Sequence, residues 1–268
     1  MLKDITIGQY FPGESVIHRL DARFKIIFSV LSAAMLFTAQ NFMGLGVAAV
    51  FIFTCFAVSE IKFRMILKSL KPIIPLIIFT GILNLFFIKG EEVLVNFAFV
   101  TIYTDGARMS AFMVTRIITL IVGMSLLTYT SSPIMLTDAI ESLLAPLKKL
   151  RFPVHELAMM MMIALRFIPL LIEETDKIIM AQKARGANLD AKGLIKKAKA
   201  LIPILIPLFI SAFKRANELA LAMECRCYKG GEGRTRLKKL KCSALDFVAL
   251  GLILCVFGII IANNIAFR

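Results

Sequence analysis

Residues 222–236, AMECRCYKGGEGRTR, bring together side chains that serve three different chemistries. Cysteines can bind a metal, a glycine-rich loop can hold phosphate, and arginines can contact nucleic acid. The spacing of Cys225 and Cys227 is tighter than that of usual zinc ligands, and the only histidines, His18 and His155, are distant in sequence. The glycines lack the Lys-Ser/Thr pair and the preceding strand of a nucleotide-binding loop. We therefore predict free thiols, no metal and no nucleotide site here.

Two polar residues inside apolar stretches, Arg116 and Asp246, are the other candidates for chemistry. An intramembrane enzyme would need a nucleophile or metal ligands, but only scattered Ser and Thr accompany these residues. Arg116 is therefore expected to pair within a helix bundle or to reach an interface. A permease with its own substrate path is disfavoured because the chain has no internal repeats or matched broken helices. No nucleic-acid partner is expected, since no soluble surface with base-reading groups is evident.

The elements that position these residues are predicted to be membrane helices. The chain has 268 residues, of which 59% are hydrophobic, and they fall in long runs. One helix over 26–58 would be about 50 Å long, too long for a hydrocarbon core of about 30 Å, so two spans turning near Asn41 are predicted. Further spans are predicted at 72–88, 107–129 and 244–262. The fold class is thus an all-α integral membrane protein with about five transmembrane helices in the lipid bilayer.

Basic residues predict which loops face the cytoplasm. Residues 133–242 hold 20 Lys and Arg against 10 Asp and Glu, and the loop 60–71 is also basic, whereas 89–105 is net acidic. Because basic loops stay inside, the N-terminus is predicted to be cytoplasmic and the C-terminus to lie outside. The first 25 residues contain no apolar region of the kind found in a cleaved signal peptide.

Two long helices are predicted between the fourth and fifth spans, at about 155–186 and 194–228. Asp190 is expected to cap the second helix, and its apolar stripe follows helical spacing. The apolar stretch 201–213 is short and is interrupted by Pro203 and Pro207, so we expect these helices to lie at or below the inner membrane face. The predicted stripe comprises Leu194, Ala198, Leu201, Leu205, Leu208 and Ala212.

The chain is accordingly predicted to have three parts. Residues 1–130 form the N-terminal segment and the first four spans, and 244–268 form the last span. Residues 131–243 form a cytoplasmic-side domain of long amphipathic helices, including a shorter one at 131–150. Both long helices end alike, in Ala184-Arg185-Gly186 and in Cys225-Arg226-Cys227. An arginine in the last turn is favoured by the negative end of the helix dipole, but two such ends in succession suggest a shared role.

Four stretches of the chain together resemble one known family. They are HRLDARFK at 18–25, LAPLKKLRFPVHELAMMMMIALRFIPLLIEE at 144–174, AQKARGA at 181–187 and KRANELALAMECRCYKGGEGRTR at 214–236. In this order they resemble the transmembrane (T) component of an energy-coupling factor (ECF) transporter, the scaffold of prokaryotic vitamin and micronutrient importers.

The resemblance implies a scaffold subunit that is not an enzyme and has no cofactor of its own, because partner subunits bind ATP. It implies two ATP-binding subunits and a small, exchangeable substrate-binding membrane protein as partners. It also implies a multi-pass protein of the prokaryotic cell membrane. A dedicated cobalt or nickel importer subunit is the alternative that remains open, since the transported compound is bound by another protein.

The resemblance also implies which residues act. The two Xaa-Arg-Xaa tips, centred on Arg185 and Arg226, would dock onto the ATP-binding subunits. At the second tip Cys227 replaces the family's usual glycine, and cysteine lacks glycine's freedom to adopt left-handed backbone. Ala22 stands where the family often has proline.

Four consecutive methionines, Met159, Met160, Met161 and Met162, are a further candidate. They wrap around more than half a helical turn, so they cannot all face one core. Methionine fills irregular gaps in buried cores, but it also forms adaptable docking surfaces. We assign the run as a candidate contact for the substrate-binding partner, and leave the core interpretation open beside it.

Overall fold

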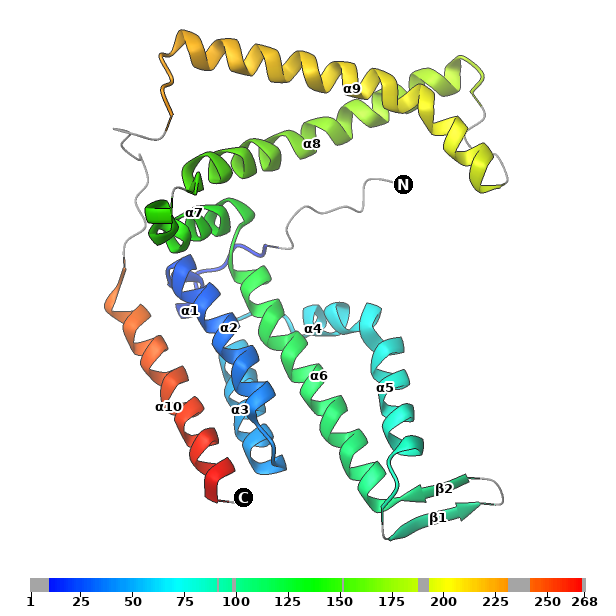
Figure 1. Ribbon diagram of the computed structural model, residues 1–268, viewed down its shortest axis with the longest axis vertical. Coiled ribbons are helices and arrows are strands. Elements are labelled where there is room, and N and C mark those ends of the chain that lie inside the picture. Colours follow the sequence, from blue (N-terminus) through cyan, green and yellow to red (C-terminus); the bar gives the residue numbers. More distant parts are fainter. Residues whose placement is uncertain are drawn as a thin grey trace. The chain divides into compact units, whose positions relative to one another are not determined.

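The computed structural model describes residues 10–90, 92–97, 100–150, 152–187, 193–230 and 242–266. In these ranges the chain is helical apart from one two-stranded hairpin (Figure 1), so the predicted all-α class is confirmed with that exception. Internal contacts divide the chain into two compact units. The bundle unit comprises Gly8–Ala139 and Leu240–Arg268, and the arm unit comprises Ile140–Lys239.

The bundle unit consists of the helices up to α6, with one hairpin among them, and the last helix of the chain, α10. A turn between α2 and α3 confirms the predicted reversal near Asn41. The hairpin, which we did not predict from the sequence, is antiparallel and precedes the long helix α6. The elements are α1 (Val16–Arg19), α2 (Ala22–Thr38), α3 (Phe42–Val58), α4 (Phe63–Leu70), η1 (Lys71–Ile73), α5 (Ile74–Phe87), β1 (Val93–Phe97), β2 (Val100–Tyr103), α6 (Thr104–Thr130) and α10 (Ala244–Ala266). The division between the two units falls within α7 (Pro133–Leu144), after Ala139.

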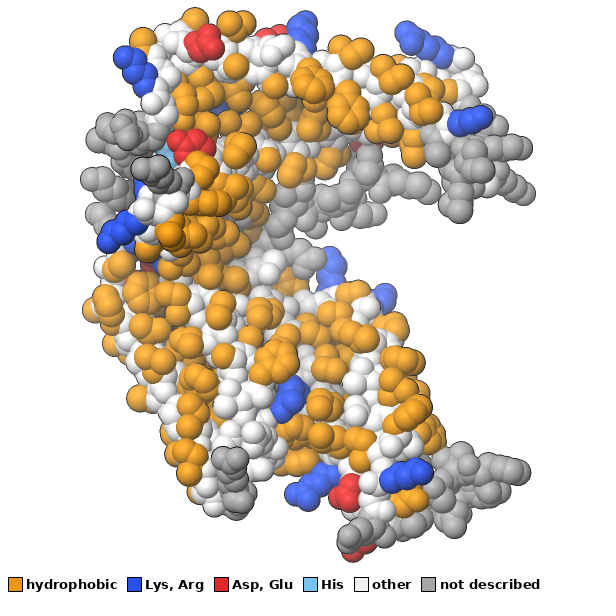
Figure 2. Space-filling view, viewed as in Figure 1, with side chains coloured by type: hydrophobic (Ala, Val, Ile, Leu, Met, Phe, Trp, Pro, Cys, Tyr) orange, Lys and Arg blue, Asp and Glu red, His pale blue; other side chains and the backbone are white. Residues whose placement is uncertain are grey.

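Helices α2, α3, α6 and α10 pack around the core of the bundle unit. The helices α2 and α3 have 17 residues each, which makes each about 25 Å long. Buried apolar side chains come from all four helices: Met35, Leu36, Leu45, Ile52, Val122, Leu126, Ile253 and Ile260. Figure 2 shows hydrophobic side chains over most of the visible face of this unit as well, as expected for a surface that meets lipid.

Five helical segments are long and apolar enough to cross a membrane, by length and composition: 63–87, 104–130, 154–184, 199–225 and 244–266. Two of them contain the predicted spans at 107–129 and 244–262, and a third covers the predicted span at 72–88 up to residue 87. The predicted spans in α2 and α3 are shorter helices. The remaining two segments belong to the long helices that we predicted to lie along the membrane, so their placement stays a prediction.

A buried polar cluster joins the beginnings of α2 and α10. The Asp246 carboxylate is fully buried; its Oδ1 accepts a hydrogen bond from the Asp21 backbone N–H at 2.8 Å, and its Oδ2 accepts from the Ser243 N–H at 2.6 Å. The Lys25 Nζ donates to the carbonyl oxygens of His18 (3.1 Å) and Thr130 (2.9 Å), which adds the end of α6. Asp246, considered above as a candidate catalytic residue, therefore has a structural role in the bundle.

His18 fixes the segment that precedes α2. Its Nε2 lies 3.0 Å from the Phe11 carbonyl oxygen, to which it donates, and its Nδ1 lies 2.7 Å from Ser15 Oγ and accepts. Burial lowers the pKa of His18, which favours the neutral ring that can make both bonds. A Cβ atom at Gly13 would lie 2.8 Å from this ring, so glycine is needed for the close approach.

Arg116, in the middle of α6, and Asn264, near the end of α10, both contact the C-terminal end of α2. Arg116 donates to the Ala39 carbonyl oxygen at 2.5 Å and stacks on Phe112, with 4.6 Å between its Cζ and the ring centre. Asn264 donates to the Thr38 carbonyl oxygen at 2.7 Å. Both acceptors lie at the C-terminus of α2, where helix carbonyls lack partners. The prediction that Arg116 pairs within the bundle is confirmed.

The arm unit contains η2 (Ala145–Leu150), α8 (Val154–Ala184) and α9 (Leu194–Cys225), and α8 and α9 pack against each other. The helix α9 runs without interruption through Pro203 and Pro207. The single helix predicted at about 194–228 is therefore confirmed, with both prolines inside it. Each proline removes one backbone hydrogen bond and strains the preceding turn, but the cost of about 3 kcal/mol is offset by packing elsewhere along a long helix.

The predicted stripe on α9 is partly wrong. Leu201 and Leu205 are exposed, whereas Leu208 and Ala212 are half-buried and Ile204 is buried. Many apolar residues of this helix are exposed, and they cover much of its visible face in Figure 2, so helical spacing alone does not decide which apolar face packs on α8. The side chains of Leu194 and Ala198 and the predicted cap Asp190 lie outside the residues whose placement is described.

Candidate coupling tips on two long helices

The first tip closes α8 with a Schellman motif. Arg185 is the C-cap, and Gly186 follows in the left-handed region with φ +84°. The Gly186 N–H donates to the Lys183 carbonyl oxygen and the Ala187 N–H to the Gln182 carbonyl oxygen, both at 3.0 Å. These are the two bonds that define the motif, and they satisfy carbonyls that the helix end leaves without partners.

The second tip repeats the same geometry at the end of α9. Arg226 is the C-cap, and Cys227 occupies the left-handed position with φ +56°. The Cys227 N–H donates to the Glu224 carbonyl oxygen at 2.8 Å, and the Tyr228 N–H to the Met223 carbonyl oxygen at 3.0 Å. Cys227 therefore adopts the left-handed backbone conformation that Gly186 has at the first tip, although cysteine lacks glycine's conformational freedom.

Each tip presents an arginine on an exposed helix end. All six tip residues are exposed: Ala184, Arg185, Gly186, Cys225, Arg226 and Cys227. A guanidinium group at a C-cap is favoured by the helix dipole, and its planar fork can donate to two acceptors at once. In the described part of the chain no group of three or more His, Cys, Asp and Glu side chains is placed to hold a metal, and the five cysteines are free thiols. The chemistry that the tips offer is therefore hydrogen bonding and charge pairing by the two guanidinium groups.

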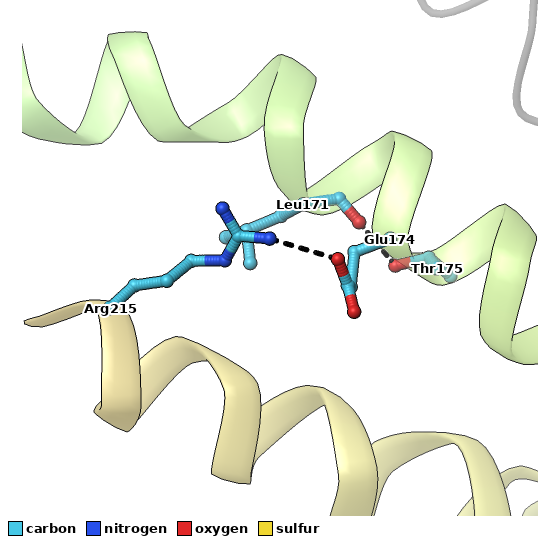
Figure 3. Close-up of polar contacts among 4 residues, drawn as sticks. All are labelled: Leu171, Glu174, Thr175 and Arg215. Carbon is cyan, nitrogen blue, oxygen red and sulfur yellow. Dashed lines mark hydrogen bonds and ion pairs between the residues drawn. The ribbon is translucent and has the colours of Figure 1, made fainter.

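Polar contacts hold the two helices that carry the tips. Glu174 Oε2 accepts a hydrogen bond from Arg215 Nη2 at 2.9 Å in a half-buried ion pair, which Figure 3 shows between α8 and α9. Gln182 Nε2 donates to the Pro203 carbonyl oxygen at 3.2 Å. Pro207 has no N–H, so it leaves that carbonyl without its helical partner, and Gln182 of α8 supplies the missing donor.

A third contact fixes the beginning of α8. His155 Nδ1 lies 3.1 Å from Glu141 Oε1 of α7, with 17% and 6% of their side chains exposed. Sequence reasoning considered His155 only as a possible metal ligand, and it did not find the pairs at Glu174 and Gln182. No spacing rule connects residues of different helices, so only the assembled arm unit brings these partners together.

The four methionines lie in the first turns of α8. Met160 is exposed, and Met159, Met161 and Met162 are half-buried, while the preceding Ala158 is buried. The run therefore surrounds the helix within the arm unit, as its spacing predicted. Its role stays a prediction.

The comparisons with known proteins now decide the family. The sequence profile of the cobalt transport protein family (CbiQ) matches residues 13–237. A protein of Clostridium kluyveri is 55% identical over 93% of both chains, and one of Ruminiclostridium cellulolyticum is 50% identical over 94% of both chains. Each is named energy-coupling factor transporter transmembrane protein EcfT. The chain belongs to the EcfT family.

Membership in the EcfT family confirms the resemblance drawn from the four sequence stretches. A third EcfT protein, from Thermosediminibacter oceani, is 51% identical over 94% of this chain and 96% of its own. The chain is thus a multi-pass transmembrane component of an energy-coupling factor transporter and is not itself an ATPase.

Proposed function

We propose that the chain transmits ATP hydrolysis by two partner ATPases to a small substrate-binding membrane protein, for uptake of vitamins or other micronutrients. The observation that carries this proposal is the pair of tips: two helix ends close with the same hydrogen bonds and expose an arginine at the same position. Two equivalent tips suit two ATPase subunits of similar shape. The Glu174–Arg215 ion pair and the Gln182 contact join α8 to α9, so a displacement of one tip would be transmitted to the other helix.

The experiment replaces each tip arginine. Arg185→Ala and Arg226→Ala should each weaken recovery of the ATPases in pull-downs or uncouple hydrolysis from uptake, since losing one partner of an interfacial charge pair costs about 2–5 kcal/mol. The matched control is Lys183→Ala, which removes an exposed positive charge close to the first tip. Normal uptake and normal ATPase recovery in the double arginine variant would contradict the proposal.

We also propose that the methionine run contacts the substrate-binding partner. Flexible side chains suit a surface that must accept several partners in turn. Replacing Met159, Met160, Met161 and Met162 by Leu should leave ATPase recovery intact, because the two residues are similar in volume and cost less than about 1.5 kcal/mol per site. The relative uptake of different substrates should change. Equal changes, or none, across two substrate-binding partners in the same membranes would leave the core interpretation.

We propose that the substrate-binding partner determines which compound is transported. Identifying the partners of this chain distinguishes a shared module from a dedicated importer. The matching family profile carries the description cobalt transport protein, while the relatives carry the name EcfT. Purification by a tag on this chain should recover several substrate-binding proteins if the chain is a shared module. Recovery of one alone, with cobalt or nickel as its substrate, would favour the dedicated importer.

A further inference from the structure

A crevice between the helices of the bundle unit has no role in the proposed coupling. It has a volume of about 290 Å³, about twice that of the engineered cavity of about 150 Å³ that binds benzene. Its walls come from α2, α3, α6 and α10, and they include Phe28, Phe51, Leu126, Ala249 and Leu252. It lies near the beginnings of α2 and α10 and the ends of α3 and α6, and so toward one face of the membrane.

The crevice continues along α3 as a shallow groove. The groove is lined by Met43, Gly46, Val47, Val50, Phe51 and Thr54, and it shares Phe51 and Thr54 with the crevice. From Met43 to Val58, α3 rises about 22 Å, which is most of a hydrocarbon core of about 30 Å. Gly46 keeps the helix surface low at one point of the groove, and no atom lies within 4 Å of a Cβ built on it. The crevice thus continues into a shallow, open apolar groove along α3.

The helix that closes the crevice is held at its two ends. Asp246 fixes the beginning of α10 to the Asp21 N–H, and Asn264 fixes its end to the Thr38 carbonyl oxygen. The lips of the crevice between these anchors are exposed: Val248 is 59% and Leu252 is 55% exposed. These side chains open the crevice to the surroundings of the bundle, which in a membrane are acyl chains.

We propose that one acyl chain of a membrane phospholipid binds in this crevice, with its head group at the membrane surface beside Arg19. Water is a poor occupant, because a bound water needs two to four polar partners and the lining is almost wholly apolar. A partner helix is about 10–12 Å across and is too wide for a hollow of this volume. Binding is favoured by dispersion contacts, since lipid and protein are equally apolar.

The charged groups favour a phospholipid over a free fatty acid. Among the described residues that line the crevice, Lys25 is the one cation, and its ammonium group already donates to the carbonyl oxygens of His18 and Thr130. A fatty-acid carboxylate inside the crevice would meet only the third N–H group of Lys25 and would lie near the Asp246 carboxylate, which repels it. A phospholipid keeps its phosphate outside the crevice, near Arg19, which is adjacent to the lining residue Leu20. The Arg19 side chain is 68% exposed, and its ion pair with the exposed Glu14 is long, at 3.8 Å, so a phosphate can compete for the guanidinium group.

The absence of Trp from the chain gives a direct test. In the full chain, Phe28→Trp places a single Trp on the crevice wall, and Val30→Trp places it about 3 Å further along α2 at a position that is 62% exposed. Phosphatidylglycerol with brominated acyl chains is titrated into detergent micelles of each variant. We expect saturable quenching of Phe28→Trp at a lipid fraction roughly tenfold below that needed for Val30→Trp.

Filling variants and a second ligand complete the experiment. Adding Ala249→Leu, or separately Cys55→Leu, to Phe28→Trp should abolish the saturable phase while helix content by circular dichroism stays unchanged. Quenching of both Trp variants at the same lipid fraction would overturn the proposal. So would saturation by a brominated fatty acid alone, or loss of the quenching when the companion subunits bind, which would place a partner side chain in the crevice. The readout does not use ATPase docking, so it is independent of the proposed coupling.

Discussion

The left-handed backbone conformation is strained at Cys227 but not at Gly186, because glycine has no Cβ atom. For a residue with a Cβ atom this conformation is less favourable by roughly 1–2 kcal/mol, because the Cβ crowds the following carbonyl oxygen. The hydrogen bonds of the second tip nevertheless hold Cys227 at φ +56°. The second tip is therefore closed by the same bonds as the first, but with a smaller margin of stability.

This difference predicts that Cys227→Gly stabilises the second tip by about 1 kcal/mol. Amide hydrogen exchange at residues 227 and 228 should then slow by about fivefold, which is the factor that corresponds to this free energy. Cys225→Ala is the matched control, because it removes a thiol from a helical position on the same tip and should leave the exchange unchanged. Gly186→Ala should speed exchange at the first tip. Unchanged exchange in Cys227→Gly would show that the cysteine is not strained.

At the residue scale, the sequence predicted the residues of the tips but not their supports. Arg185 and Arg226 could be found because helix ends have local signals, a periodic segment followed by a stop. Gly186 indicated a helix end with left-handed backbone, because glycine is common at that position, whereas a cysteine such as Cys227 does not indicate one. Glu174 and Arg215 could not be paired in advance, since they are 41 positions apart on different helices.

At the element scale, α9 shows how a helix with two interior prolines is kept intact. The prolines are four residues apart, so the carbonyl that Pro207 leaves without a donor is that of Pro203. A hydrogen bond to such a carbonyl contributes about 0.5–1.5 kcal/mol to stability. Gln182 supplies this bond from the neighbouring helix at an exposed position, and it thereby also fixes α8 against α9 close to the first tip.

The contact predicts a non-additive pair of substitutions. Gln182→Ala should destabilise the chain by about 0.5–1.5 kcal/mol in the natural background. In a Pro207→Ala background the restored N–H can bond to the Pro203 carbonyl oxygen, so the same change should cost much less. The measurement is unfolding of the four proteins in detergent, with a coupling energy of at least about 0.5 kcal/mol expected. Lys183→Ala, an exposed neighbour, should show no coupling, and additive effects at Gln182 and Pro207 would refute the role of the contact.

The elements themselves were predictable where length and composition act alone. The reversal near Asn41 follows from the length limit of a span, and α5, α6 and α10 follow from apolar runs. The hairpin at 93–103 was missed because its residues are few and lie in a loop identified by its charge alone. The second long helix, predicted at about 194–228, is continuous although proline is disfavoured inside a helix, because tertiary packing overrides that preference here.

At the scale of the whole molecule, two features of α8 and α9 favour different locations. Length and composition permit these helices to cross the membrane, whereas their charged residues favour a location at its inner face. Both helices are long and apolar enough to cross a bilayer. Yet a crossing α8 would carry Glu173, Glu174, Asp176 and Lys177 toward the hydrocarbon, and each charge near a span's centre costs about 2.5–3.5 kcal/mol on insertion scales. Helices lying at the inner face avoid this cost and keep the basic surplus of 133–242 in the cytoplasm.

The two arrangements differ in where the first tip lies, and this gives the last prediction. If α8 and α9 both crossed, Ala184 would face outside while Cys227 faced inside; if both lie at the inner face, the two positions share the cytoplasmic side. In a background without other cysteines, the thiols of Ala184→Cys and of Cys227 should therefore react with an impermeant maleimide only after the membrane is permeabilised. A Glu92→Cys variant, altered at an exposed position of the acidic loop, should react from outside and serves as the positive control. Labelling of Ala184→Cys in intact cells would show that α8 crosses the membrane, and the two tips could then no longer meet ATPases on one side.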